Sequence, residues 1–253
     1  MASSLGAAGR PGVRHVPTRA SAHAAIRVRP WQAVAYSVVD MGSIVLMGDP
    51  SVANIPVDEC GEPLEVAGSD FAMSPLKEAD DPYRSRLRAG VRSRLIAAQS
   101  YLPTGFRICW VEGHRDARLQ EHYFTNYRQH LRGLAPTLDG EASYLLASRY
   151  VSPPAIAPHV SGAAIDLTLC DEDGNELDMG TRVNASPEES NGACYFDAPV
   201  SAEARAHRNV LARALSEVGL VNYPTEWWHW SYGDRYWAMK TGAPAAIYGA
   251  LTD

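Results

Sequence analysis

The sequence predicts an α+β fold in a single domain, with a central, mainly antiparallel sheet flanked by helices. Strand-like and helix-like segments follow one another without the regular βαβ alternation of a parallel sheet. A turn signal at Asp173-Gly174-Asn175, between two strand-like segments, indicates a hairpin. The chain has 253 residues, of which 46% are apolar and 21% charged, so it can bury a sizeable core.

Residues 1–29 contain several arginines and no acidic residue. This composition is shared by organelle transit peptides, but no amphipathic repeat accompanies the arginines. We therefore expect a mobile basic tail outside the fold, and a folded domain over residues 30–253. That domain begins with strand-like segments at 33–39 and 44–46, which loop signals follow.

The middle of the chain alternates helices and strands. A helix is expected over 82–100, because Leu87, Val91 and Leu95 recur every fourth position, with Ala98 one turn further on the same side. Arginines cover the other face. The apolar run 106–111 is suited to a buried strand. Asp116 is placed to cap a second helix that ends near residue 132. Its expected inward residues are Leu119, Tyr123, Tyr127 and Leu131.

The last third of the chain contains the remaining strands and one long helix. Residues 164–169 alternate apolar and polar side chains, as a half-buried strand does, and 176–179 would return as its hairpin partner. Residues 180–200 are expected to form a long loop. Ser201 caps a helix, Gly219 ends it, and an aromatic strand follows at 226–232. The apolar face of that helix is expected to be Val210, Leu211, Ala214, Leu215 and Val218.

Charge and composition exclude several functional classes. The net charge is −6 and no basic stripe runs along the folded part, so a nucleic-acid partner is not expected. No apolar run approaches the roughly 20 residues of a membrane helix, so a membrane partner is not expected either. The four cysteines show no C-x-x-C spacing, and the N-terminus lacks a signal-peptide pattern. We therefore expect free thiols and a cytoplasmic location.

Two short segments hold the residues of a catalytic metal site. His159 and Asp166 are seven positions apart, with Gly162 between them permitting a tight bend, and Glu226 precedes His229 by three. A catalytic zinc typically takes three protein ligands and leaves one position open, and a spare carboxylate can accept a proton from water. The alternatives are a surface aspartate, a solvated glutamate, and histidines that are solvated or bonded to backbone carbonyls. On a strand, positions three apart face opposite sides, so Glu226 must lie at the strand entrance or at a bulge.

These segments resemble the D-alanyl-D-alanine dipeptidase family, which is related to the zinc D-Ala-D-Ala carboxypeptidases and to the N-terminal signalling domain of hedgehog proteins. The resemblance rests on the pattern S-x-H-x-x-G-x-A-x-D at 157–166 and E-x-x-H at 226–229, and it extends over about residues 85–240. It implies the fold of these proteins. It also implies one zinc per chain, bound by His159, Asp166 and His229, with Glu226 as the base.

The resemblance also assigns a role to an arginine. The family has Gly-Tyr-Arg after a strand, and Gly113-His114-Arg115 matches it here. Arg115 would then bind the carbonyl oxygen as it becomes an oxyanion, a task that the planar guanidinium suits. The alternative for Arg115 is an ion pair with Glu112 or Asp116. The chain departs from the family pattern at Ala157, where the family has serine, at Asn184, where it often has aspartate, and over residues 30–80.

The implied function is zinc-dependent hydrolysis of D-Ala-D-Ala or a similar small dipeptide. Such an enzyme would supply alanine from cell-wall dipeptide, or remove the precursor that vancomycin-type antibiotics target. The alternatives are a peptidoglycan D,D- or L,D-carboxypeptidase or endopeptidase of the same fold, which would need export, and a non-catalytic zinc-binding module. Residues 30–253 are thus expected to be a zinc peptidase domain, with its oligomeric state left open.

Overall fold

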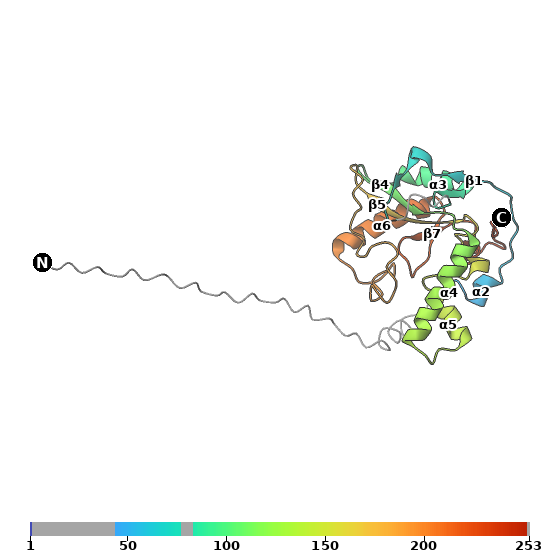
Figure 1. Ribbon diagram of the computed structural model, residues 1–253. Helices are drawn as coiled ribbons and strands as arrows, with labels where there is room; N and C mark the ends of the chain where they lie inside the picture. Colours follow the sequence, from blue (N-terminus) through green and yellow to red (C-terminus); the bar gives the residue numbers. More distant parts are fainter. Residues whose placement is uncertain (2–43, 77–82, 252–253) are drawn as a thin grey trace.

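The computed structural model describes residues 1, 44–76 and 83–251 (Figure 1). The basic tail at 1–29 and the strand expected at 33–39 lie outside these residues. The strands are β1 (Leu64–Val66), β2 (Ala72–Met73), β3 (Arg86–Arg88), β4 (Arg107–Glu112), β5 (Ala164–Cys170), β6 (Val221–Asn222) and β7 (His229–Ser231). The helices are α2 (Pro50–Ala53), α3 (Ala89–Gln99), α4 (Ala117–Leu134), α5 (Gly140–Ala147), α6 (Ala202–Glu217) and α7 (Arg235–Thr241). Short 3-10 turns are η1 (Gly68–Asp70) and η2 (Pro154–Ile156).

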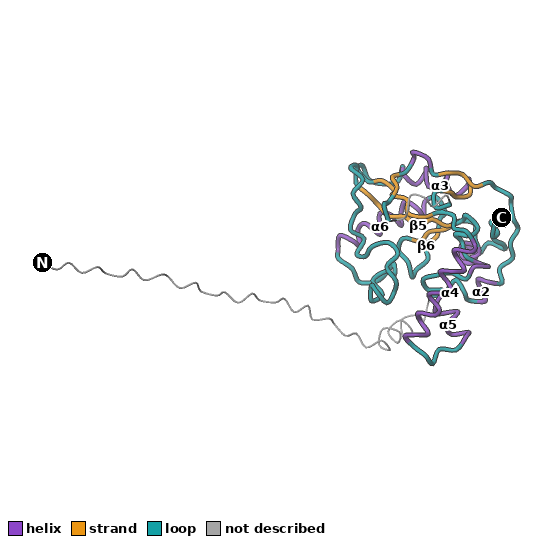
Figure 2. Tube along the Cα trace, in the orientation of Figure 1, coloured by secondary structure: helices purple, strands orange, loops and turns teal. Residues whose placement is uncertain are grey.

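The α+β fold with a mainly antiparallel sheet is confirmed. The main sheet has five strands in the order β2-β4-β5-β7-β6, and its pairs are antiparallel except β2 with β4. Helices α3 and α6 lie beside β4 and β5, and α4 and α5 lie together toward the other end of the molecule (Figure 1). Long loops connect the helices and strands (Figure 2). Among the described helices, none is both long and apolar enough to cross a lipid bilayer.

The central strand β5 is buried along its whole length. The strand expected at 164–169 is present, but the prediction that it is only half-buried is wrong. Its polar positions, Asp166 and Thr168, are 3% and 1% exposed, because other parts of the chain cover both faces of the sheet. A polar side chain on a fully covered strand must have a partner, so Asp166 marks a site inside the molecule.

Two expected elements differ from the structure near the N-terminal side of the sheet. Residues 44–46 form no strand, and α3 begins at Ala89 instead of near residue 82. The reason is β3, which pairs antiparallel with β1 and occupies Arg86–Arg88. Leu87 is nevertheless buried, because its side chain on β3 packs into the same core as the apolar residues of α3.

Helix α4 begins where expected but faces the core differently. The Asp116 side chain accepts hydrogen bonds from the amides of Arg118 and Leu119, which confirms the cap. The buried residues are Gln120, Phe124, Tyr127 and Leu131, so the expected inward face is confirmed at Tyr127 and Leu131. Leu119 and Tyr123 are only half-buried. The rotation arises because α4 packs against α5, a helix that the sequence analysis did not anticipate.

The C-terminal elements follow the expected order with shorter bounds. Ser201 caps α6, and Gly219 adopts a left-handed φ of 84° after it, as expected. Leu211, Ala214 and Leu215 are buried, while Val210 and Val218 are half-buried. The hairpin partner at 176–179 is reduced to a bridge between Cys170 and Glu176. The aromatic strand is reduced to β7, with Glu226 in the turn before it.

The long loop at 180–200 is confirmed, and one buried arginine fastens it to α6. The Arg208 side chain is fully buried and donates hydrogen bonds to the carbonyl oxygens of Met179 (2.8 Å), Ala193 (2.8 Å) and Tyr195 (2.6 Å). Burial lowers the pKa of Arg208 to about 10, so the guanidinium keeps its charge at neutral pH. The loop is therefore held in one position by backbone acceptors around a cation.

We expect Arg208→Leu to lower the free energy of unfolding by about 3 kcal/mol, because buried carbonyls lose their donors. Loop 180–200 should also become sensitive to limited proteolysis. Urea unfolding followed by circular dichroism measures the first effect. Arg213→Leu, at an exposed position of the same helix, is the matched control. Equal stability of the two variants would contradict the inference that the hydrogen bonds of Arg208 stabilise the fold.

Candidate active site and metal centre

The candidate site begins with one row of residues across the sheet. Asp166 on β5 is the register partner of His229 on β7 and, on its other side, of Glu112 on β4. Directly opposed residues of antiparallel strands project to the same face with Cβ atoms about 4.5–5.5 Å apart. A bulge between Trp110 and Glu112 shifts the register of β4 by one residue and brings Glu112 into the row. The pairing thus places two carboxylates and an imidazole side by side.

His159 reaches this row from the loop before β5. Gly162 turns the chain with a left-handed φ of 68°, and a Cβ atom there would lie 2.4 Å from the Leu64 side chain, so only glycine fits. The His159 Nδ1 atom lies 2.6 Å from the Gly113 carbonyl oxygen. That contact makes Nδ1 the protonated nitrogen and leaves the lone pair of Nε2 pointing at the sheet.

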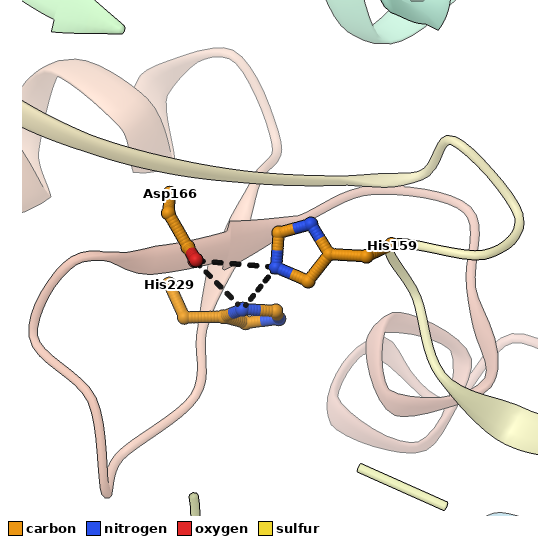
Figure 3. Close-up of side chains that lie close together, drawn as sticks. All are labelled: His159, Asp166 and His229. Atoms are coloured by element: carbon orange, nitrogen blue, oxygen red, sulfur yellow. Dashed lines mark hydrogen bonds and ion pairs between the residues drawn. The ribbon is translucent and has the colours of Figure 1, made fainter. Parts of the chain in front are cut away.

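Three atoms from these residues form a nearly equilateral triangle (Figure 3). His159 Nε2 is 3.2 Å from His229 Nδ1 and 3.3 Å from Asp166 Oδ1, and His229 Nδ1 is 3.1 Å from Asp166 Oδ1. Each of the three side chains is 5% exposed or less. The lone pairs of His159 Nε2 and of the Asp166 carboxylate face each other, which is unfavourable unless a cation lies between them.

The triangle fits a zinc ion by donor type and by spacing. Imidazole nitrogen and carboxylate oxygen are both zinc ligands, and tetrahedral bonds of about 2.0–2.1 Å place the donor atoms roughly 3.3 Å apart. Burial raises the pKa of Asp166, but the charges and hydrogen bonds of His159 and His229 outweigh it and hold that pKa well below its usual range. Burial also lowers the pKa of His229. The ionised carboxylate and the neutral imidazole are the forms that bind metal.

Glu226 lies beside the triangle without being part of it. Its Oε2 atom is 3.8 Å from His229 Nδ1. The turn that holds it is closed by hydrogen bonds from its own amide to the Tyr223 carbonyl and from the His229 amide to its carbonyl. Burial and the nearby Asp166 charge raise the pKa of Glu226 well above its usual range, against the lowering effect of Arg115. A buried carboxyl group with a raised pKa beside possible metal ligands is a candidate for proton transfer.

Arg115 faces the same space in a fixed orientation. Its Nε donates to Glu112 Oε1 at 2.8 Å, its Nη2 to Glu112 Oε2 at 2.6 Å, and its Nη1 to Gln120 Oε1 at 2.8 Å. The Gln120 Nε2 in turn donates to the Ser152 carbonyl, which sets the direction of the amide. A guanidinium has five N–H bonds, so one on each terminal nitrogen is left for a ligand, counting partners among the described residues. Glu112 raises the pKa of Arg115, although burial opposes this.

A cavity of about 410 Å³ joins these groups to solvent. Its volume lies within the range of small-molecule sites. The lining residues are Arg115, Gln120, Tyr123, Asn126, Tyr127, His130, Tyr150, Val151, Ser152, His159, Asp166, Asn184, Glu226 and His229. All five residues that the sequence singled out for metal binding and catalysis thus line one cavity. Their individual roles stay predictions.

The sequence analysis missed part of this cavity. Glu112 was considered only as an alternative partner of Arg115, and the ion pair does form, while Asp116 caps α4 instead. Gln120 was not singled out, although an amide four residues after a helix cap and facing the core is an available signal. Asn184 was noted only as a departure from a pattern, and it lines the cavity with a left-handed φ of 59°.

Comparison with known proteins agrees with this geometry. A family model described as D-ala-D-ala dipeptidase matches residues 142–243, which include the triangle and Glu226. A D-alanyl-D-alanine dipeptidase of Synechocystis sp. is 27% identical over 217 residues, covering 74% of this chain and 88% of that protein. Another from Escherichia coli strain K12 is 39% identical over 71 residues, covering 28% of this chain and 35% of that protein. The resemblance to the D-alanyl-D-alanine dipeptidase family is confirmed.

A solved structure of LdcB, an LD-carboxypeptidase, is similar over 72% of each chain, with a TM-score of 0.40 and 18% identity. The family match and the relatives support a peptidase, and therefore a hydrolase. The family match begins at residue 142 and leaves out Glu112, Arg115 and Gln120, so their place in the site rests on the structure.

We expect Glu112→Gln to lower the free energy of unfolding by about 3 kcal/mol, because it leaves the Arg115 cation buried without its counter-charge. The double variant Glu112→Leu/Arg115→Met should recover most of that stability, since apolar pairs often replace buried ion pairs without loss. If Arg115 binds the oxyanion, the double variant should still lose about 100-fold or more in kcat/KM. Thermal unfolding and a peptidase assay separate the two effects. Normal turnover by the double variant would make the ion pair purely structural.

Proposed function

We propose that this protein is a zinc-dependent dipeptidase that hydrolyses the peptide bond of D-Ala-D-Ala or a similar small dipeptide. The observation that carries the proposal is the triangle formed by His159, Asp166 and His229, which shares one cavity with Glu226 and Arg115. The donor atoms of these three residues would bind one zinc ion per chain. When bound, the ion supplies a Lewis acid that activates water and polarises the scissile carbonyl.

Glu226 would move the proton. Hydrolysis adds hydroxide to the carbonyl carbon and a proton to the leaving amine, and breaks the C–N bond between them. The Glu226 carboxylate accepts the proton of the attacking water and then donates it to the amine nitrogen. A divalent cation beside Glu226 would oppose the rise of its pKa and favour the carboxylate form that accepts the proton.

Arg115 would stabilise the charge that develops on the carbonyl oxygen. Its guanidinium is fixed by Glu112 and Gln120 before the substrate arrives, so no reorganisation is needed during the reaction. The Arg115 amide also donates to the His159 carbonyl at 3.1 Å, while His159 Nδ1 bonds to the Gly113 carbonyl. These two contacts couple the position of the arginine to that of one metal ligand.

The substrate is inferred from relatives, two of which are named D-alanyl-D-alanine dipeptidases. We place the enzyme in the cytoplasm, where reduced thiols agree with its four unpaired cysteines, three of them buried. The dipeptide would come from turnover or synthesis of the cell wall. A non-catalytic zinc module of the same fold has no use for the buried Glu226 and the two donors left on Arg115, so the geometry favours an enzyme.

We expect Glu226→Gln to bind zinc normally and to lose about 100-fold or more in kcat on D-Ala-D-Ala, because the amide cannot accept a proton. Release of D-alanine measures turnover, and elemental analysis measures the metal. Glu217→Gln, at an exposed position at the end of α6, is the matched control. A Glu226→Gln variant with near-normal turnover would remove the assigned base.

We expect the purified protein to bind one zinc per chain, and a chelator to remove both the metal and the activity. Zinc should raise the thermal unfolding temperature, since it binds the folded state alone at this site. His159→Ala should abolish that rise, while His122→Ala, on the exposed side of α4, should leave it unchanged. A zinc-dependent rise that survives in the His159→Ala protein would show that the ion binds elsewhere.

A further inference from the structure

Two of the proposed functional residues lie at the two ends of one tight turn. The stretch from Tyr223 to His229 folds as two consecutive turns that share Glu226. The Glu226 amide donates to the Tyr223 carbonyl at 2.9 Å, and the His229 amide donates to the Glu226 carbonyl at 3.2 Å. On a regular strand, side chains three positions apart face opposite sides. The second turn therefore brings the Glu226 carboxylate to the side of the His229 imidazole, 3.8 Å from its Nδ1 atom.

The side chain of Asn222 bridges the ends of this second turn. Asn222 lies on β6 as the register partner of Trp230 on β7, and it is half-buried. Its Nδ2 atom donates to the Glu226 carbonyl oxygen at 2.9 Å and to the His229 carbonyl oxygen at 2.9 Å. An amide NH2 group has two hydrogens, so both of them are used on these two carbonyls.

The chemistry of the two acceptors sets the direction of the Asn222 amide. Carbonyl oxygens accept hydrogen bonds and cannot donate them, so the NH2 end of the side chain must face them. Aspartate has almost the same shape but would present an oxygen to two oxygens. The position therefore requires a double donor, which asparagine provides and aspartate does not.

The two carbonyls do not depend on Asn222 for their only donor. The Glu226 carbonyl also accepts from the His229 amide, and the His229 carbonyl also accepts from the Tyr223 amide at 3.0 Å. A carbonyl oxygen has two lone pairs, so loss of the Asn222 side chain would leave each oxygen with one donor. The side chain therefore contributes more to the shape of the turn than to the burial of its polar groups.

Other contacts hold the outside of the same stretch. The Thr225 hydroxyl donates to the Arg149 carbonyl oxygen at 2.6 Å, and the Trp227 amide donates to the Cys194 carbonyl oxygen at 3.0 Å. Thr225 and Trp227 are both buried. These contacts fix where the stretch lies in the protein, so a change at Asn222 would alter the shape of the turn without releasing it.

We infer that Asn222 is a positioning residue, which sets the separation of the proposed base Glu226 and the proposed metal ligand His229 by joining their carbonyl groups. This inference rests on the proposed function for the roles of those two residues. Asn222 is not among the residues that line the cavity, so it acts through the backbone of the turn. A misplacement of about 1 Å in such an arrangement can lower a rate about 100-fold.

The test measures turnover and metal binding of Asn222→Ala in the full chain. With zinc bound, kcat on D-Ala-D-Ala should fall by about 10- to 100-fold, as for other residues that orient metal ligands, while KM changes little. The zinc dissociation constant should rise by about tenfold or more. The visible absorption spectrum of the cobalt(II)-loaded protein should also change, because it reports the geometry of the ligands. The unfolding temperature should fall by only a few degrees.

Asn222→Asp separates hydrogen-bond donation from the filling of space. If donation matters, this variant loses more turnover and more zinc affinity than Asn222→Ala, because its carboxylate faces two carbonyl oxygens. If the side chain only fills space, the order is reversed, since aspartate keeps the volume of asparagine, and the inference is overturned. Where Asn222→Asp does not fold, Asn222→Ala decides alone.

The matched control is Asn175→Ala. The Asn175 Nδ2 atom also donates within a turn, to Asp171 Oδ2 at 3.0 Å, but the residue is exposed and does not line the cavity. Its variant should keep the turnover, zinc affinity and cobalt spectrum of the original protein. The same three results for Asn222→Ala would overturn the inference and leave the proposed function intact.

Failure of the proposed function has a different signature, namely that the original protein binds zinc and does not cleave D-Ala-D-Ala. Zinc affinity and the cobalt spectrum then judge the inference. Values that change in Asn222→Ala and not in Asn175→Ala support it, and values unchanged in both variants overturn it.

Discussion

The hydrogen-bonded register between β5 and β7 is the constraint on which the site depends. It sets Asp166 opposite His229, and the neighbouring register on β4 adds Glu112 to the same row. Two residues 63 positions apart in the chain thereby become lateral neighbours, with atoms 3.1 Å apart. His159, in the loop that ends at Gly162, then completes the triangle. The geometry of the ligands is thus a property of the sheet itself.

Buried charge is the second organising feature, and three buried arginines show how it is stabilised. Glu112 holds Arg115, Glu188 holds the fully buried Arg149 at 2.6 Å, and backbone carbonyls surround Arg208. Glu112 orients a catalytic candidate, Glu188 also accepts a hydrogen bond from the Tyr127 hydroxyl, and Arg208 fixes the loop that carries Asn184. These polar contacts link loop 180–200 to the cavity.

Local signals in the sequence were sufficient for the helix caps and for the positions of the main strands along the chain. The motifs and the family resemblance indicated five residues that the structure brings to one cavity. Asp116 and Ser201 could be predicted as helix caps, because a short polar side chain at the start of a helix accepts hydrogen bonds from the amides of its first turn. Features set by long-range pairing could not be read in this way. β3 replaces the first turns of an expected helix because β1 pairs with it, and α4 is rotated because α5 packs against it. The position of Gln120 beside Arg115 depends on that rotation, so it became visible only in three dimensions.

The row shared by Glu112, Asp166 and His229 also restricts how relatives of this protein can diverge. Strand side chains alternate between faces, so a one-residue slip of β7 against β5 would turn the His229 imidazole away from its neighbours. Length changes should therefore be purged from the short stretch between Tyr223 and His229 during evolution, while the surface turn at Asp171–Asn175 can grow or shrink freely. Relatives that have lost hydrolysis should show insertions or deletions in this short stretch before they lose the metal ligands themselves.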